Sequence, residues 1–265
     1  MKISVYALLQ FLLCFSLLSF RPAAAQTIKG DEQIRSHWSA GSIKADGHLH
    51  DWKDSLSYHN EDTRFSFDIS NDDETLFIAV KSEDNQNLNR IFSRGISFSF
   101  NTEGKKKAGA TIVFPILERG AQTGRSGKTP SAAQSKELRK KMLADIRRIN
   151  VYGFPEIRDG AISIQNTYGI AAAATFNEQE DLIIELEVPL RLLGITTDSQ
   201  PIACLFEING VKAPRTAYDP NRDPRNTRYG YPSRGYGYER LPRYNKNNEP
   251  TGFWVRTTLA KNLNK

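Results

Sequence analysis

Hydrophobic and polar residues alternate along much of the chain at the period of a β-strand. In "RFSFDIS" (64–70) the apolar residues fall on one face, and "TLFIAVKSED" (75–84) alternates in the same way. A polar "NDDE" turn (71–74) separates the two runs. Asn and Asp side chains bond nearby backbone amides, so this arrangement predicts a β-hairpin.

Similar runs recur at regular spacing through the rest of the chain. The regular spacing predicts a mainly β fold, an antiparallel β-sandwich within one domain over residues 43–262, rather than alternating β and α units. The further strand-like runs are "GISFSFNTEG" (95–104), "KKKAGATIVFPI" (105–116), "AISIQNTYG" (161–169), "IAAAATFN" (170–177), "DLIIELEVPL" (181–190), "PIACLFEING" (201–210) and "GFWVRTTLA" (252–260).

One segment, at about residues 130–149, has the period of a helix instead. Thr129 followed by Pro130 is a typical helix start. The opposite face is strongly basic, and the sequence predicts one inserted amphipathic helix packed on the sheet. A helix lying on a membrane surface is the alternative, although the apolar stripe has no aromatic residue. The stripe consists of Leu138, Met142, Ile146 and Ile149.

The first 25 residues have the pattern of a secretory signal peptide, with a basic start, an apolar core and small residues before Gln26. The apolar run is too short to span a membrane, and cleavage after Ala25 predicts an exported protein without a membrane span. Residues 26–42 are polar and predict an irregular lead-in. After cleavage Cys204 is the one remaining cysteine, which favours a small buried side chain over a disulfide.

The net charge of +6 falls to +4 when Lys2 and Arg21 leave with the signal peptide. Basic patches usually indicate nucleic acid, which an exported protein rarely meets. Surface solubility is therefore the favoured explanation of the charge, with an anionic glycan as the alternative. As partner the sequence predicts a glycan or an anionic envelope polysaccharide, no nucleic acid, and a monomer.

A long segment at about 213–250 is dense in Pro, Gly, Arg and Tyr and lies between two predicted strands. Loops of this length are functional or disordered. Tyrosine rings stack on sugars, and arginines bind carboxylates or sulfates in a bidentate manner. The candidate ligand-binding residues are Arg228, Tyr229, Tyr231, Arg234, Tyr236 and Tyr238, with Trp254 in the last strand.

Two patterns suggest metal ions. His48 and His50 share one face of an extended segment, where a transition metal would also need Asp46 or Asp51, and solvent-facing imidazoles are the alternative. In the 71–74 turn, Asp72 and Asp73 offer oxygen ligands for Ca²⁺, and Asp84 completes the candidate set. Metal-free hairpin turns are also rich in Asn and Asp, so a turn without a metal ion is the alternative. Ca²⁺ is the candidate cofactor of this turn.

Three segments resemble family-9 carbohydrate-binding modules and their DOMON-like relatives. They are "IKADGHLHDWKD" (43–54), "FDISNDDETLFIAVKSED" (67–84) and "LIIELEVPLRLLGI" (182–195). The resemblance implies a jelly-roll β-sandwich that binds saccharides between aromatic side chains without catalysis, often with structural calcium. It also implies that Leu49 and Trp52 are structural.

The sequence contains no Gly-x-Ser-x-Gly, His-Glu-x-x-His or phosphate-loop motif. We therefore expect a non-catalytic protein that binds a glycan or envelope component. The alternatives are a periplasmic scaffold that contacts another protein, and a weak glycoside hydrolase accessory with a carboxylate pair.

Overall fold

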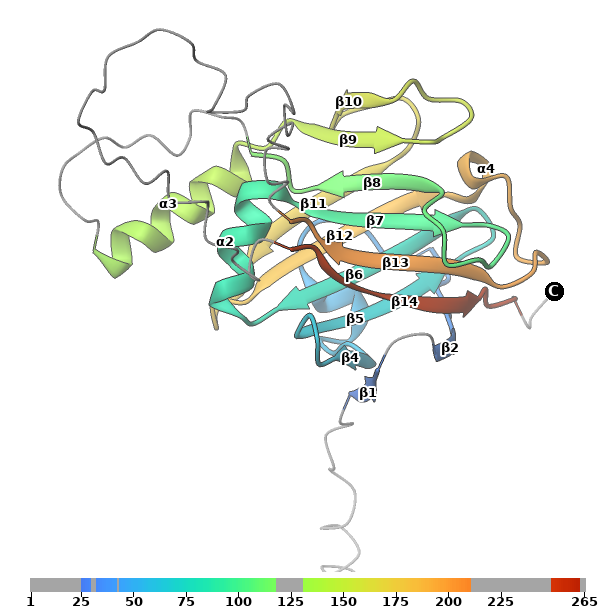
Figure 1. The fold of residues 1–265 in the computed structure, drawn as a ribbon, viewed down its shortest axis with the longest axis horizontal. Coiled ribbons are helices and arrows are strands. Elements are labelled where there is room, and N and C mark those ends of the chain that lie inside the picture. Colours follow the sequence, from blue (N-terminus) through green and yellow to red (C-terminus); the bar gives the residue numbers. More distant parts are fainter. Residues whose placement is uncertain (1–24, 30–31, 42, 118–130, 211–248, 263–265) are drawn as a thin grey trace, which may run out of the picture.

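The computed structural model describes residues 25–29, 32–41, 43–117, 131–210 and 249–262. Two seven-stranded β-sheets face each other as a sandwich, with α2 and α3 at one end and α4 at the other (Figure 1). The predicted mainly β sandwich is therefore confirmed. Within these ranges no helix has both the length and the apolar character needed to cross a membrane.

The first sheet, sheet A, contains the predicted hairpin at its centre. The register pairs Phe67 with Val80, which places the apolar residues of both strands on the inner face. In spatial order the strands are β1 (Gln26–Ile28), β4 (Tyr58–Asn60), β5 (Phe65–Asn71), β6 (Thr75–Ser82), β12 (Leu182–Pro189) and β11 (Ala171–Phe176), with β3 (His37–Trp38) also paired to β5.

The second sheet, sheet B, contains the returning C-terminal strand, which confirms the prediction for "GFWVRTTLA". In spatial order its strands are β10 (Gly160–Ser163), β9 (Arg148–Tyr152), β8 (Ala110–Phe114), β7 (Ile96–Asn101), β13 (Ile202–Ile208), β14 (Thr251–Thr258) and β2 (Glu32–Arg35).

Both sheets are mixed, which corrects the prediction of a purely antiparallel sandwich. The pairs β1–β4, β3–β5 and β14–β2 are parallel. All three involve strands of residues 26–38, so the prediction of an irregular lead-in is also wrong. These strands have two to four residues, and their hydrogen-bond partners lie in β4, β5 and β14, far away in the sequence. The jelly-roll connectivity implied by the resemblance stays a prediction.

Phenylalanine side chains join the two sheets. Phe67 of sheet A packs against both Phe206 and Phe253 of sheet B, with ring centroids 5.0 and 5.1 Å away. Phe206 and Phe253 stack at 5.2 Å, and Phe98 meets Phe206 edge-on. These geometries are favourable for aromatic pairs and fill the centre of the core.

Cys204 is free and buried in the same core, as the sequence predicts. Burial raises the pKa of its thiol to about 12. The thiol is therefore uncharged at neutral pH and packs as a small apolar group.

The inserted helix is shorter than predicted and begins elsewhere. Helix α3 (Ala132–Ala144) is capped by a reciprocal pair, Ser131 and Gln134, whereas Thr129 and Pro130 lie outside the described residues. Met142 is buried, but Leu138 is 46% exposed and Ile149 belongs to β9. The predicted stripe thus joined residues of two different elements, and the helix packs through its last turn.

The sequence predicted one inserted helix, but the structure has further helical segments between the strands. Helix α2 (Asn85–Arg94) is capped by Asp84, whose side chain accepts a hydrogen bond from the Gln86 amide, and it buries Leu88 and Ile91. The others are α4 (Leu190–Leu193) and the 3-10 turn η1 (Leu49–Trp52).

Candidate functional site

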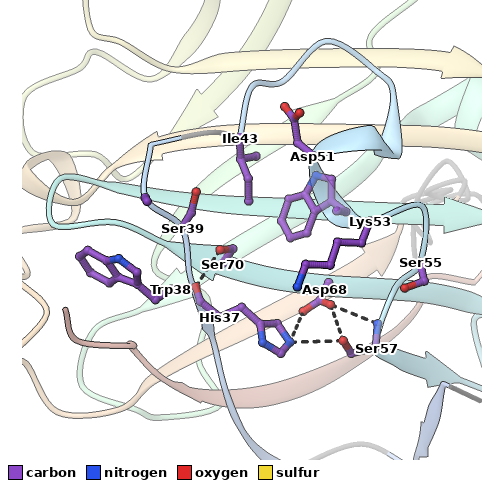
Figure 2. Close-up of a pocket in the computed structure, with 12 residues that line it drawn as sticks. His37, Trp38, Ser39, Ile43, Asp51, Lys53, Ser55, Ser57, Asp68 and Ser70 are labelled. Carbon is purple, nitrogen blue, oxygen red and sulfur yellow. Dashed lines mark hydrogen bonds and ion pairs between the residues drawn. The ribbon is translucent and has the colours of Figure 1, made fainter. Parts of the chain in front are cut away.

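A half-open pocket of about 350 Å³ lies on the outer face of sheet A (Figure 2). Its floor comes from β5, one wall from β3, and its roof from the segment that follows β3. The lining residues are His37, Trp38, Ser39, Ala40, Ile43, Asp51, Trp52, Lys53, Ser55, Ser57, Asp68 and Ser70.

Strand alternation supplies the polar floor. Phe67 and Ile69 of β5 point into the core, so Asp68 and Ser70 point to the opposite face. The short strand β3 pairs in parallel with the end of β5, with His37 beside Ser70. The Ser70 hydroxyl donates to the His37 carbonyl at 2.7 Å and fixes this wall against the floor.

Asp68 is the centre of a hydrogen-bonded cluster on the floor (Figure 2). It is 4% exposed, and its Oδ2 accepts from the Ser57 amide at 3.1 Å and the Ser57 hydroxyl at 2.6 Å. His37 Nε2 lies 3.3 Å from Asp68 Oδ1 and 3.2 Å from Ser57 Oγ. Burial and the nearby Asp68 charge raise the pKa of Tyr58 behind the cluster.

The cluster has the residue types of a catalytic triad but not its arrangement. In a triad, Ser and Asp contact different nitrogens of the imidazole, and the hydroxyl donates to the ring. Here Ser57 and Asp68 both approach Nε2 of His37, and the Ser57 hydroxyl donates directly to Asp68. This geometry holds the imidazole in place and does not activate the serine.

The roof is the segment that contains "DGHLHDW". Trp52 is 7% exposed and packs with Ile43, Leu56 and Phe77 in a small core on the outer face of sheet A, which confirms its predicted core role. Asp51 Oδ2 accepts from the Lys44 amide at 3.1 Å, which closes the segment on itself.

Glu185 of β12 anchors this roof to the sheet. Its carboxylate is 1% exposed; Oε1 accepts from the Trp52 indole at 2.6 Å, and Oε2 accepts from the backbone amide of Gly47 at the same distance. The amides of Asp46 and His48 also donate to Oε2, at 3.1 Å each. Burial raises the pKa of Glu185 to about 7, although the four donors favour its charged form.

Two of the three segments that carry the family resemblance therefore meet physically. "ELEV" in β12 provides Glu185, and also Glu187, whose Oε1 accepts from the Ala45 amide at 2.6 Å. Both acceptors bind the backbone of "ADGH". The resemblance motifs thus build the roof of the pocket.

Several groups in the pocket are available to a ligand. The indole of Trp38 is half-buried on one wall, and the Lys53 side chain extends across the pocket on the side of Asp68 (Figure 2). The hydroxyl of Ser39 is buried without a hydrogen-bond partner among the described residues. An unpaired buried hydroxyl costs free energy that a ligand hydroxyl would recover.

Lys53 and Asp54 both have left-handed backbone conformations, with φ of 56° and 55°. Residues with a Cβ adopt this region at a cost of about 1 kcal/mol or more, and such strain is frequent at binding sites. At Lys53 the strained residue ends η1 and places its ammonium group at the pocket.

We therefore expect Lys53→Gly to raise the free energy of unfolding by about 0.5 kcal/mol, because glycine relieves the strain but loses more chain entropy. Lys53→Ala removes the same ammonium group and keeps the strain, so it should not be stabilising. Urea unfolding of both variants tests this, and equal stabilities would contradict it.

The predicted ligand-binding residues are not at this pocket. Arg228, Tyr229, Tyr231, Arg234, Tyr236 and Tyr238 lie outside the described residues. Trp254 is half-buried in β14 of sheet B, next to Leu205, on the face opposite to the buried Phe253 and Val255.

The predicted calcium ligands do not converge. Asp72 precedes β6 and its Oδ1 accepts from the amides of Glu74 and Thr75, whereas Asp84 lies beyond the other end of the strand and caps α2. Eight strand residues separate them by roughly 25 Å. Asp84 also pairs with Arg64. In the described part of the chain, no group of three or more His, Cys, Asp or Glu side chains is arranged to hold a metal ion.

His48 and His50 are exposed, as the solvent-facing alternative predicts. Their rings stack with centroids 5.7 Å apart, and His50 Nδ1 lies 3.3 Å from Asp54. The carboxylates named with them bond backbone amides: Asp46 accepts from His48, and Asp51 from Lys44.

The sequence reasoning did not find His37, Trp38, Ser39 or Asp68 as pocket residues. Asp68 had a visible signal, since it is a carboxylate on the polar side of an otherwise apolar strand. The β3 residues had none, because they lie in the segment that was predicted to be irregular.

Comparison with known proteins adds no assignment: no protein-family model matches the chain, and none of the curated proteins matches it significantly.

Proposed function

We propose that the protein is an exported, non-catalytic binding protein that takes one sugar unit of a glycan in the pocket of Figure 2. The observation that carries the proposal is the combination of the Trp38 indole with the unpaired, buried Ser39 hydroxyl in one pocket. A sugar offers C–H faces that pack on an indole and hydroxyls that donate and accept hydrogen bonds. Ligand sites have this composition of aromatic walls with a few placed polar groups.

The charges of the pocket support a neutral sugar. The Lys53 side chain extends toward Asp68 (Figure 2), Asp68 is already bonded to Ser57 and His37, and Asp51 also lines the pocket. The carboxylates therefore offer remaining acceptor capacity to hydroxyl groups, and the ammonium of Lys53 offers donors. The volume of about 350 Å³ is in the range of sites for small ligands.

Trp38→Ala is expected to weaken binding of the glycan about 10- to 100-fold, because it removes the stacking surface and leaves the polar groups in place. The glycan is first identified on an array of neutral and acidic glycans, and its affinity is then measured by isothermal titration calorimetry.

Trp254→Ala is the matched control, since it deletes the same side chain type from the other sheet. Unchanged affinity in Trp254→Ala together with loss in Trp38→Ala supports the pocket. Loss in Trp254→Ala alone would instead place the ligand on sheet B. A folded protein that binds no glycan on the array would count for the scaffold alternative.

A further inference from the structure

A second pocket, of about 300 Å³, lies between α3 and the end of β11. Helix α3 packs against β11, and it stands beside α2 at one end of the sandwich (Figure 1). The pocket is separate from the one in Figure 2 and shares no lining residue with it. Its lining residues are Asn85, Ser135, Lys136, Arg139, Phe176 and Glu180.

The hydrogen-bonded turn between β11 and β12 provides one side of this pocket. The side chain of Asn177 accepts from the Asp181 amide at 2.8 Å, which closes the turn between β11 and β12. Glu180 in this turn has a left-handed φ of 69° and points its carboxylate at α3, where it lies 2.8 Å from Lys136 Nζ. Phe176 ends β11 and stacks on Phe92 of α2 at 6.0 Å, so its ring is fixed.

The charges around the pocket do not balance. The hydrogen bond and charge of Lys136, with the charges of Arg139 and Lys140, hold the pKa of Glu180 below its usual value. One carboxylate thus faces three cations. Within the described residues, Arg139 makes no hydrogen bond or ion pair, although its side chain is half-buried in the lining.

We propose that this pocket binds the anionic group of an acidic sugar. Arg139 presents a planar fork that matches an oxyanion in a bidentate manner, and Lys136 adds a compact charge. Ser135 and Asn85 offer further donors, and the Phe176 ring offers an apolar surface to the sugar ring. Glu180 occupies Lys136 when the pocket is empty and competes with the ligand anion.

The test uses trigalacturonate and its fully methyl-esterified form, which has the same sugar rings without the charge. Calorimetry on the purified protein at about 50 and 300 mM salt is expected to show binding of the acid alone, weakened by salt. Arg139→Ala should weaken it about 10- to 100-fold, as expected for a hydrogen bond between two charged groups.

Two further variants separate a site from a diffuse basic surface. Lys141 is exposed on the same helix and does not line the pocket, so Lys141→Ala should leave the affinity unchanged within about twofold. Glu180→Gln should strengthen binding about threefold or more, because it removes the competing carboxylate and frees Lys136. A purely structural role of the Lys136–Glu180 pair would not strengthen binding.

Equal losses in Arg139→Ala and Lys141→Ala would overturn the proposal in favour of a general polyanion surface. The proposal would also be overturned if the methyl ester bound as tightly as the acid, or if the acid did not bind. Binding to phosphatidylglycerol vesicles that is as tight as binding to the acid, and that survives Arg139→Ala, would overturn it as well. Trp38→Ala should have no effect on this measurement. If it abolishes trigalacturonate binding, the acid occupies the pocket of Figure 2 and the second site is wrong, whereas the proposed function stands.

Discussion

Replacement of Glu185 by alanine is expected to lower the free energy of unfolding by about 3–5 kcal/mol at pH 7. The carboxylate is buried and accepts from the Trp52 indole and from three consecutive backbone amides. Alanine leaves all four donors without their acceptor beneath the roof segment. The same change should abolish binding in the pocket of Figure 2, because Asp51, Trp52 and Lys53 lose their anchor.

Urea unfolding and calorimetric titration measure the two effects. Glu187→Ala is the matched control: Glu187 stands two residues away on the same strand face but accepts from one amide, that of Ala45. We expect it to cost about 1 kcal/mol. If Glu185→Ala costs no more than Glu187→Ala, the roof is held by its apolar contacts and not by this carboxylate.

The pH dependence of stability follows from the same group. Burial raises the pKa of Glu185 from 4.5 to about 7, so the folded protein binds this proton more tightly than the unfolded chain does. Its contribution to stability is therefore greatest below pH 4.5, falls as the pH rises to about 7, and is constant above. The change is on the order of 3 kcal/mol.

Glu185→Gln should remove this dependence. The glutamine oxygen can still accept from the backbone amides, but its NH₂ group meets the Trp52 indole N–H as a second donor. The variant therefore has a flatter profile between pH 4.5 and 7, and its loss of stability relative to the original protein is largest at low pH. Identical profiles for the variant and the original protein would show that Glu185 does not titrate in this range.

The hairpin of β5 and β6 could be predicted because its evidence is local. Its apolar residues alternate, an Asn/Asp turn follows, and the inner face is buried as expected. The strands of residues 26–38 could not, because their hydrogen bonds come from β4, β5 and β14, and their own pattern is polar. Tertiary pairing decides such edge strands.

The pocket was beyond prediction for a related reason. Asp68 and Glu185 could be recognised as carboxylates on the outer faces of apolar strands, which already implies partners. Which segment supplies those partners depends on contacts across long separations, such as Trp52 to Glu185, which lie 133 positions apart. The sequence instead directed attention to the tyrosine-rich segment at about 213–250, because local composition can be read from the sequence and long-range packing cannot.

Phe206→Ala is expected to lower the free energy of unfolding by about 3–5 kcal/mol, as much as Glu185→Ala. The loss arises in the core between the two sheets and not in the roof of the pocket. Phe206 is fully buried and contacts Phe67 of the opposite sheet as well as Phe98 and Phe253 of its own. Its removal leaves a cavity where the two sheets meet, and rings held from both sheets cannot collapse into it.

Leu205→Ala is the control for Phe206→Ala, since Leu205 directly precedes Phe206 in β13 and lies half-buried on the outer face of sheet B. We expect a loss of about 1 kcal/mol there, because part of the side chain is already in water. The difference between the stability losses of Phe206→Ala and Leu205→Ala measures the contribution of core packing, because both residues lie in the same strand and share its pairing. Similar losses at both positions would mean that the outer face of sheet B is packed as tightly as the core. The aromatic cluster would then not be the main contact between the two sheets.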